Sequence, residues 1–310
     1  MPAIGRADVK TITCVGIGVI GASWASFFLS RGFRVRATDV DRTAFDRALP
    51  AIATSMADLG DLGPIADDWQ SRLHFEGDLE AAVHGADFIQ ENGPEQLPLK
   101  CAVFEKLDRF APPDVVIASS TSGIPMSRIQ DACRHPQRCV VGHPFTPVHL
   151  IPLVEVAGGH ATDPSAVAWA LGFYRSIGKK VAHVRKDVPG FIVNRFQTLV
   201  LQEALSLVKN GVATVAEIDE AFINGPGLRW ALYGPFALTA FSAGEEGLGV
   251  ALRRYKSHRD NVLASITPVD VDESLIETVA EQVDALSRST TPQEALRKRD
   301  RCLVKLLQAI

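Results

Sequence analysis

The 310-residue sequence is poor in cysteine and lacks the paired cysteines that bind metals or carry redox chemistry. Its five cysteines are scattered, and none is followed by a second cysteine three residues later. The cluster of cysteines and histidines that begins at Cys133 and ends at His143 has the spacing of no known zinc site, so we expect no metal. Isolated cysteines are typical of a reducing compartment, which predicts a cytoplasmic location.

The sequence also lacks a strong charge of either sign, internal repeats and low-complexity tracts. Its formal net charge of −4 predicts neither a nucleic-acid partner nor a membrane partner. The most apolar stretch, residues 11–30, contains five glycines and serines before Phe27. That composition favours a buried strand that turns into a helix over a signal peptide or a membrane span.

The same stretch carries a dinucleotide-binding fingerprint. A short β-rich run at residues 11–15 precedes Gly16-x-Gly18-x-x-Gly21, and a helical pattern follows to about residue 30. In this motif Gly16 makes the tight turn, Gly18 lets the backbone approach the pyrophosphate, and Gly21 lets the helix pack on the strand. The sequence therefore predicts a bound dinucleotide.

Two further features of the fingerprint concern the phosphates and the ribose. Val19 and Ile20 begin the predicted helix, whose N-terminus should face the phosphates. Asp39 ends the next predicted strand, about twenty residues beyond the glycines. Its carboxylate should accept hydrogen bonds from the ribose and repel a 2′-phosphate, which favours NAD over NADP although Arg42 lies close by.

Strands and helices continue to alternate up to residue 187. This alternation predicts an α/β fold, with a Rossmann-type, doubly wound and mostly parallel sheet in an NAD-binding domain at residues 1–187. Lys179 and Lys180 are expected to form a solvated strand start. The further predicted strands are residues 86–92, 114–122, 138–143, 150–156 and 179–184, and the predicted helices are residues 97–111 and 164–178.

The pattern becomes purely helical after the segment "RKDVPG". Thr214 and Glu217 have the spacing of a capping box at the start of one helix. We expect an all-helical C-terminal domain at residues 188–310 that serves substrate binding and dimerisation. Its predicted helices are residues 191–211, 214–224, 272–286 and 291–308.

An ionisable pair stands in the nearly uncharged stretch "GHPFTPVHLIPLVEV". Burying His143 or Glu155 alone would be costly, so we expect the two side chains to pair. Pairing with a carboxylate tunes a histidine for proton transfer. Two other interpretations stay open at this point, a hydrogen-bonded core histidine and a structural partner of Glu155 among the arginines.

Taken with the fingerprint, the segments "ASSTSG", "GHPFTPVHLIPLVEV" and "DVPGFIVNR" stand in an order that resembles the L-3-hydroxyacyl-CoA dehydrogenase family over nearly the whole chain. The segments "FIQENGPEQLPLK" and "GPGLRWALYGP" are more similar to the branch that oxidises free 3-hydroxy acids. That branch includes lambda-crystallin (L-gulonate 3-dehydrogenase) and L-carnitine 3-dehydrogenase.

The resemblance implies catalytic roles for four residues. His143 is the general base, Glu155 orients it, and Ser122 and Asn194 hydrogen-bond the substrate oxygens. The alternative for Asn194 is a side chain at a helix start that bonds the backbone. The family has an asparagine three residues after the base, where this chain has Thr146, so any role of that amide in orienting the substrate is open.

The resemblance also implies contacts outside the catalytic set. Glu95 and Lys100 match cofactor contacts of the family. Arg229 lies among glycine, proline and tryptophan, where its guanidinium could bind a substrate carboxylate. A salt bridge at a helix end is the equally weighted alternative for Arg229.

The leading hypothesis is an NAD-dependent dehydrogenase that oxidises a small free L-3-hydroxy acid of the L-gulonate type. L-Carnitine would need an aromatic surface for its trimethylammonium group, for which Trp230, Tyr233 and Phe236 are candidates. A CoA ester is less favoured, because the chain has no lysine between residues 11 and 99. A crystallin-like NAD-binding protein is the non-enzyme alternative.

We expect a homodimer, because the helices after residue 190 carry more apolar surface than one small domain can bury.

Overall fold

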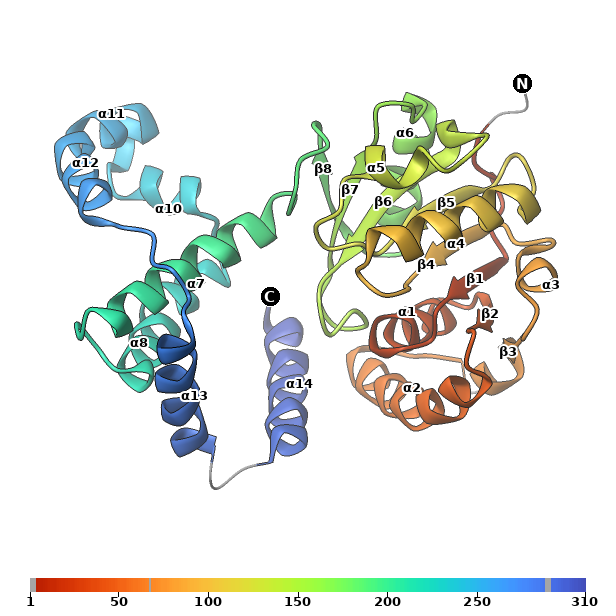
Figure 1. The fold of residues 1–310 in the computed structure, drawn as a ribbon, viewed down its shortest axis with the longest axis horizontal. Coiled ribbons are helices and arrows are strands. Elements are labelled where there is room, and N and C mark those ends of the chain that lie inside the picture. Colours follow the sequence, from red (N-terminus) through yellow and green to blue (C-terminus); the bar gives the residue numbers. More distant parts are fainter. Residues whose placement is uncertain (1–3, 67, 288–290) are drawn as a thin grey trace. The chain divides into compact units, whose positions relative to one another are not determined.

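The computed structural model describes residues 4–66, 68–287 and 291–310 (Figure 1). Its contacts divide the chain into two compact units. The first runs to Asn194 and includes Arg299–Ala309, and the second comprises Arg195–Lys298 with Ile310.

The first unit is built on one eight-stranded sheet with the strand order β3-β2-β1-β4-β5-β6-β7-β8. Neighbouring strands are parallel except for β6 and β7, which are antiparallel. This architecture confirms the predicted doubly wound, mostly parallel sheet. The strands are β1 (Thr11–Val15), β2 (Arg34–Thr38), β3 (Leu73–Phe75), β4 (Phe88–Glu91), β5 (Val116–Ser119), β6 (Cys139–Pro144), β7 (Leu153–Gly158) and β8 (Lys180–Val184).

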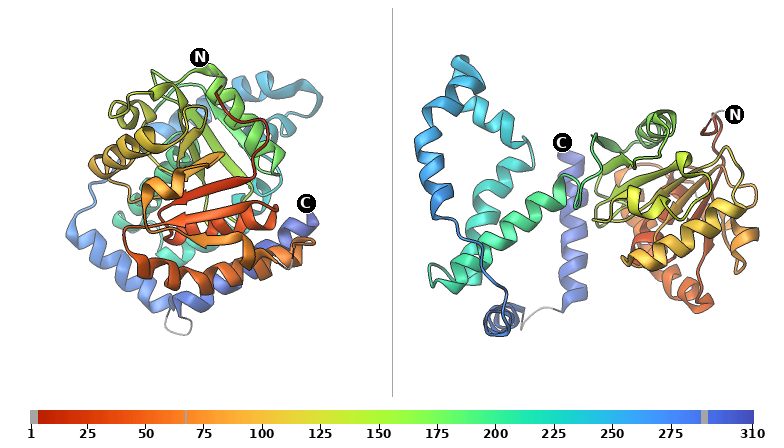
Figure 2. Two further views of the ribbon diagram at one scale, coloured as in Figure 1. Left: turned by 90° about the vertical axis from the view of Figure 1, so that its right-hand side faces the viewer. Right: turned by 45° about the horizontal axis from the view of Figure 1, so that its top comes forward.

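Helices cover both faces of this sheet (Figures 1 and 2). Side chains alternate along each strand, so Val116 and Ala118 join one apolar cluster while Ile117 joins the other. The first cluster includes α1 (Val19–Ser30), α2 (Arg42–Leu62) and α6 (Pro164–Ser176). The second includes α3 (Leu79–Val83), α4 (Leu97–Phe110) and α5 (Met126–Gln130). Two 3-10 turns, η1 (Trp69–Arg72) and η2 (Pro136–Arg138), complete the unit.

The connection from β8 to α7 (Val193–Lys209) is hydrogen-bonded to the start of α5. The carboxylate of Asp187 accepts hydrogen bonds from the backbone N–H groups of Met126 (3.1 Å) and Ser127 (2.7 Å). The contact-based division of the chain falls after Asn194, seven residues beyond the point where the sequence pattern changes. Residues Arg299–Ala309 also belong to the first unit, where Gln308 Nε2 donates to the carbonyl of Asp61 (2.8 Å).

The second unit contains only helices and turns in its described residues, as predicted for the C-terminal region. Thr214 and Glu217 form the expected capping box at the start of one helix. In the described part of the chain no helix is both long enough and apolar enough to span a membrane. The helices from residue 193 onward are α7 (Val193–Lys209), α8 (Val215–Phe222), the π-helical turn η3 (Ile223–Gly227), α9 (Leu228–Trp230), α10 (Pro235–Phe241), η4 (Gly244–Glu246), α11 (Gly247–Arg254), α12 (Lys256–Ser265), α13 (Glu273–Ser287) and α14 (Pro292–Ala309). The greater part of α14, from Arg299, belongs to the first unit.

Lys179 corrects one expectation from the sequence, because it is buried and not solvated. Only 3% of its surface is exposed, whereas Lys180 is exposed as expected. Lys179 Nζ donates to the carbonyls of Val148 (2.5 Å) and Ile151 (3.0 Å). Burial disfavours its charged form and lowers the pKa of this ammonium to about 7.

The buried ammonium makes stability depend on pH in a predictable direction. The folded-state pKa of Lys179 lies below the ordinary value of 10.5, so the unfolded chain binds more protons between about pH 7 and 10. Stability should therefore rise with pH in this window, by up to about 1.4 kcal/mol per pH unit. We expect urea unfolding to show that rise in the natural chain and in the control Lys180→Met, but not in Lys179→Met. Equal pH slopes in all three proteins would contradict the prediction.

Candidate active site

The turn between β1 and α1 has the geometry that a dinucleotide requires. Gly16 has a φ of +85°, a conformation that glycine adopts without strain. A Cβ atom at Gly21 would lie 1.9 Å from the carbonyl oxygen of Gly16, so no side chain fits there. At Gly18, in contrast, a Cβ would meet nothing within 4 Å. The described protein atoms therefore do not require a glycine at position 18, whereas a dinucleotide that approaches the backbone there would.

The start of α1 presents backbone donors beside this turn. Gly18 is its N-cap and supplies no side-chain hydrogen bond, and Val19 is 82% exposed. The first N–H groups of a helix carry a partial positive charge and suit phosphate oxygens. The residues present therefore fit the pyrophosphate of NAD.

Asp39 lies next to the glycine turn and is held by the backbone. It directly follows β2, and its Oδ2 accepts a hydrogen bond from the N–H of Ile17 (2.9 Å). Its Oδ1 accepts from the N–H of Asp41 (3.0 Å). A carboxylate fixed at this point can accept hydrogen bonds from a ribose, as the fingerprint predicts.

The predicted ionisable pair is formed across the antiparallel strands β6 and β7. His143 and Glu155 are register partners, and His143 Nδ1 lies 2.9 Å from Glu155 Oε2. Glu155 is fully buried and His143 is nearly so. The twelve-residue spacing is explained by the loop of residues 145–152, which turns the chain back on itself.

The other oxygen of Glu155 is held by the turn that leads into α7. Its Oε1 accepts hydrogen bonds from the N–H groups of Ile192 and Val193, each at 2.9 Å. Phe191, just before them, has a φ of +47°, which is strained for a bulky side chain. This backbone feature has no sequence signature apart from the preceding Gly190. Three hydrogen bonds thus satisfy a carboxylate that water cannot reach.

Two aromatic rings lie near the imidazole of His143. The ring of Phe145 lies 4.5 Å from it, and the ring of Phe191 lies 5.7 Å from it, measured between centroids. The imidazole is therefore fixed by the carboxylate on one side and by packing around its faces.

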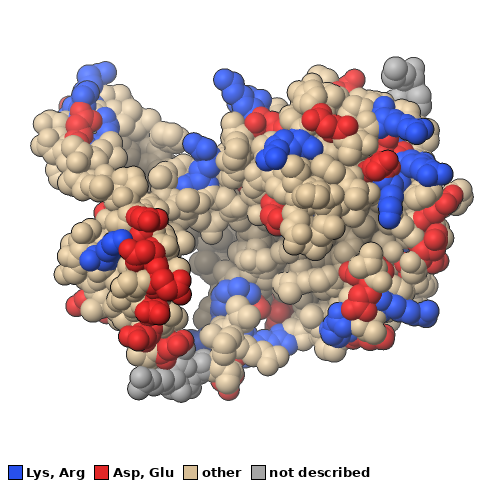
Figure 3. All heavy atoms as spheres, in the orientation of Figure 1, with Lys and Arg blue, Asp and Glu red and all other residues tan. Residues whose placement is uncertain are grey.

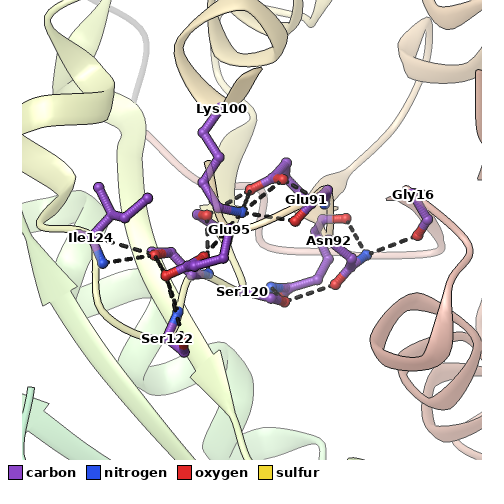
Figure 4. A network of polar contacts seen from close by, with 12 residues as sticks. Gly16, Glu91, Asn92, Glu95, Lys100, Ser120, Ser122 and Ile124 are labelled. Atoms are coloured by element: carbon purple, nitrogen blue, oxygen red, sulfur yellow. Dashed lines mark hydrogen bonds and ion pairs between the residues drawn. The ribbon is translucent and has the colours of Figure 1, made fainter. Parts of the chain in front are cut away.

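Ser122, Asn194 and Glu95 are also brought together. Asn194 Nδ2 donates to the carbonyl of Ser122 (2.7 Å). Glu95 Oε1 accepts from the backbone N–H groups of Ser122 (3.0 Å) and Gly123 (2.9 Å), and from the hydroxyls of Thr121 (2.7 Å) and Ser122 (3.3 Å) (Figure 4). Ser122 follows β5, and His143 is the last residue but one of the adjacent parallel strand β6, so both lie at the same edge of the sheet.

Glu91 is a site residue that the sequence interpretation missed. It ends β4, is fully buried, and accepts two bonds of 3.1 Å from Lys100 Nζ (Figure 4). Ser119 Oγ (2.6 Å) and the N–H of Gly93 (2.6 Å) also donate to it. An acid in the apolar strand "FIQE", with a lysine nine residues later, was the available signal. Lys100 is itself only 2% exposed, and its ammonium forms an ion pair with Glu91. A contact between Lys100 and the cofactor stays a prediction.

Thr146 and Arg229 are both exposed. Thr146 lies in the loop that follows the base His143. Arg229 is an exposed residue of α9 in the second unit. Within the described chain its guanidinium has no carboxylate within 4 Å, so the alternative of a helix-end salt bridge finds no support there.

Comparison with known proteins places both units in one family. Residues 11–188 match the model of the 3-hydroxyacyl-CoA dehydrogenase NAD binding domain, and residues 190–280 match that of the C-terminal domain. An L-carnitine dehydrogenase from Streptomyces griseus is 42% identical over 302 residues, which are 97% of this chain and 90% of the relative. One from a Pseudomonas species is 39% identical over 310 residues, covering 100% and 96% of the two chains.

A solved structure agrees with these relatives. It is that of 5-formyl-3-hydroxy-2-methylpyridine 4-carboxylic acid 5-dehydrogenase, described as an NAD⁺-dependent dismutase. Its TM-score is 0.83 at 32% identity, with 96% of this chain and 97% of that chain covered. The resemblance drawn from the sequence is thus confirmed: the chain is an NAD-dependent dehydrogenase that belongs to the 3-hydroxyacyl-CoA dehydrogenase family.

Proposed function

We propose that this protein oxidises the 3-hydroxyl group of a small free L-3-hydroxy acid to the 3-keto acid, with His143 as general base. The observation that carries the proposal is the buried contact between His143 Nδ1 and Glu155 Oε2 at 2.9 Å. L-Carnitine is the first substrate to test, because relatives named for it match almost the whole chain. L-Gulonate, the hypothesis from the sequence, is the second.

The paired carboxylate determines which nitrogen of His143 can act. An ionised Glu155 only accepts hydrogen bonds, so Nδ1 of the neutral imidazole must carry the proton. Nε2 then has a free lone pair and can accept the proton of the substrate hydroxyl. Glu155 stabilises the imidazolium that results. NAD, when bound, accepts the hydride that leaves the substrate carbon.

Ser122 and Asn194 are suited to hold the substrate oxygens. The hydroxyl of Ser122 makes only a long bond of 3.3 Å to Glu95, so it can turn to a substrate oxygen at little cost. Asn194 uses one amide hydrogen for the carbonyl of Ser122, and an amide has a second hydrogen and an oxygen. These two polar groups, Ser122 after β5 and Asn194 in the first turn of α7, would thus orient the alcohol toward His143.

The charges favour a free acid over a CoA ester. Coenzyme A carries several phosphates and needs cations, but the chain has no lysine between residues 11 and 99. Acidic side chains gather over α13 in the view of Figure 3, and its exposed carboxylates are Glu273, Glu277, Glu281 and Asp284. For the trimethylammonium group of carnitine, the second unit offers exposed aromatic rings at Trp230, Tyr233 and Phe236.

A substrate screen tests the proposed function. NADH formation at 340 nm is followed with L-carnitine, L-gulonate, L-3-hydroxybutyrate and L-3-hydroxybutyryl-CoA under the same conditions. We expect turnover with at least one free acid to exceed turnover with the CoA ester. Activity on the CoA ester alone would refute the proposed substrate class.

Removing the base should abolish most turnover and leave cofactor binding intact. We expect His143→Gln to lower kcat by about 10²–10⁴-fold, the usual contribution of general base catalysis. Glu155→Gln should cost about 10²-fold or more, because a carboxamide no longer enforces the Nδ1–H tautomer. Fluorescence titration should give NADH dissociation constants close to that of the natural chain. His84→Gln, at an exposed histidine, is the control, and full activity in His143→Gln would refute the assignment.

Arg229 provides a test of how the substrate carboxylate is bound. We propose that its guanidinium pairs with this carboxylate, since the described chain gives it no acidic partner. Arg229→Met should then raise KM for the free hydroxy acid roughly tenfold or more, with little change in NADH affinity. Arg253→Met, at another exposed arginine of the same unit, is the matched control. An unchanged KM would remove Arg229 from the substrate site.

We further infer a homodimer formed through the second unit. Among the described residues of 195–298 only Ser206, Ala243, Ala251 and Leu275 are buried. So few buried residues are unusual for a stable domain, and exposed apolar side chains that gather on a surface are typical of protein interfaces. The exposed apolar residues include Phe196, Leu199, Leu201, Phe222, Leu228, Trp230, Leu232, Phe236, Phe241 and Leu263.

Light scattering at micromolar concentration measures the assembly directly. The monomer mass is 33.5 kDa, so we expect a particle of about twice that mass. A particle of monomer mass across the whole concentration range would contradict the dimer.

A further inference from the structure

Lys179, which the proposed reaction does not use, anchors the loop that follows His143. This loop, residues 145–152, joins His143 on β6 to the strand that carries Glu155. Lys179, just before β8, donates to two of its carbonyls, those of Val148 (2.5 Å) and Ile151 (3.0 Å). One buried side chain thus holds the loop at two points.

Aromatic rings of α1 face the same ammonium. Lys179 Nζ lies 3.9 Å from the ring centre of Phe27 and 5.2 Å from that of Trp24. In the described residues no carboxylate lies within 4 Å of it, and Arg31 is a nearby like charge. A buried lysine without a counter-ion is costly, and a methionine would fill the same space without that cost. The loop carbonyls and the rings of α1 are what the ammonium binds.

A second contact joins the loop to α1. Ser23 Oγ on α1 accepts a hydrogen bond from the N–H of His149 (2.9 Å) and lies 2.9 Å from His149 Nδ1. Because Ser23 Oγ accepts from the backbone, its own proton is available for Nδ1, and Nε2–H then faces Asp58 on α2 (3.5 Å). Both contacts join the loop to α1, the helix whose N-terminus fits the pyrophosphate.

We propose that Lys179 is a positioning residue for the reaction: by fixing the 145–152 loop on α1, it sets the spacing between the cofactor helix and the base His143. The link to the base is direct, since Phe145 opens the loop and its ring packs on the imidazole at 4.5 Å. The proposal rests on the proposed role of His143. Small misplacements of reacting groups slow the chemical step strongly, so the effect should appear in kcat.

Three variants test the proposal with NAD and L-carnitine, or with the free acid that the screen ranks first. We expect Lys179→Met to lower kcat at least about tenfold, with the NADH dissociation constant within about threefold of the natural value. Ser23→Ala, which removes the second contact, should lower kcat in the same direction but less. Lys180→Met, the exposed neighbour with the same loss of charge, should behave like the natural chain.

A kinetic isotope effect separates positioning from a loss of folded protein. With substrate deuterated at carbon 3, a misplaced base slows the chemical step, so the isotope effect on kcat should rise in Lys179→Met. A smaller folded fraction would lower kcat and leave the isotope effect unchanged, and that result would overturn the proposal. A kcat of Lys179→Met within twofold of the natural value would also overturn the proposal.

Circular dichroism tests whether Lys179 is needed for folding. If Lys179→Met and the more conservative Lys179→Gln both lack the circular dichroism of the natural chain, Lys179 is a folding residue and the proposal is wrong. Activity in His143→Gln would instead refute the base itself.

Discussion

The active site depends on one buried carboxylate whose hydrogen bonds are all satisfied by the protein. Glu155 has no access to water, and its two oxygens accept from His143 Nδ1 and from the N–H groups of Ile192 and Val193. A buried charge left without these partners would be strongly destabilising. The same bonds that stabilise the charge therefore lock the strand that bears the base to the turn that leads into α7. Asn194 follows this turn directly, which explains how a residue 51 positions after His143 joins the same site.

Carboxylates that accept several hydrogen bonds from the protein are also found in β4 and in the segment that follows it. Glu91 is satisfied by Lys100, Ser119 and the backbone of Gly93, and Glu95 gathers the donors of the turn after β5. Lys179 is a buried cation whose partners are two loop carbonyls and an aromatic ring. Each of these charges fixes a loop at the carboxyl end of the sheet, where ligands bind in folds of this kind, and of the three only Glu95 is exposed. Charges that are costly for stability thus define the geometry of the site.

Local patterns predicted much of this structure. The glycines, the position of Asp39 and the strand–helix alternation depend on short-range chain geometry, and they predicted the sheet and the cofactor. The pairing of His143 with Glu155 followed from the cost of isolated charges in an apolar stretch. The burial of Lys179 could not be predicted in this way, because its acceptors are carbonyls about thirty residues earlier and its neighbour Lys180 is solvated. The strained backbone of Phe191 likewise depends on tertiary contacts that no local pattern records. The partner of Glu91, in contrast, lies only nine residues later in the chain.

The central claim is that Glu155 holds His143 as the Nδ1–H tautomer, with Nε2 free to accept a proton. Nitrogen NMR of the natural chain labelled at its histidines reports this tautomer directly, and comparison with His143→Gln assigns the signal. At a pH where the imidazole is neutral, the account predicts a protonated, pyrrole-type Nδ1 and an unprotonated, pyridine-type Nε2. The opposite tautomer, or an equal mixture of the two, would contradict it.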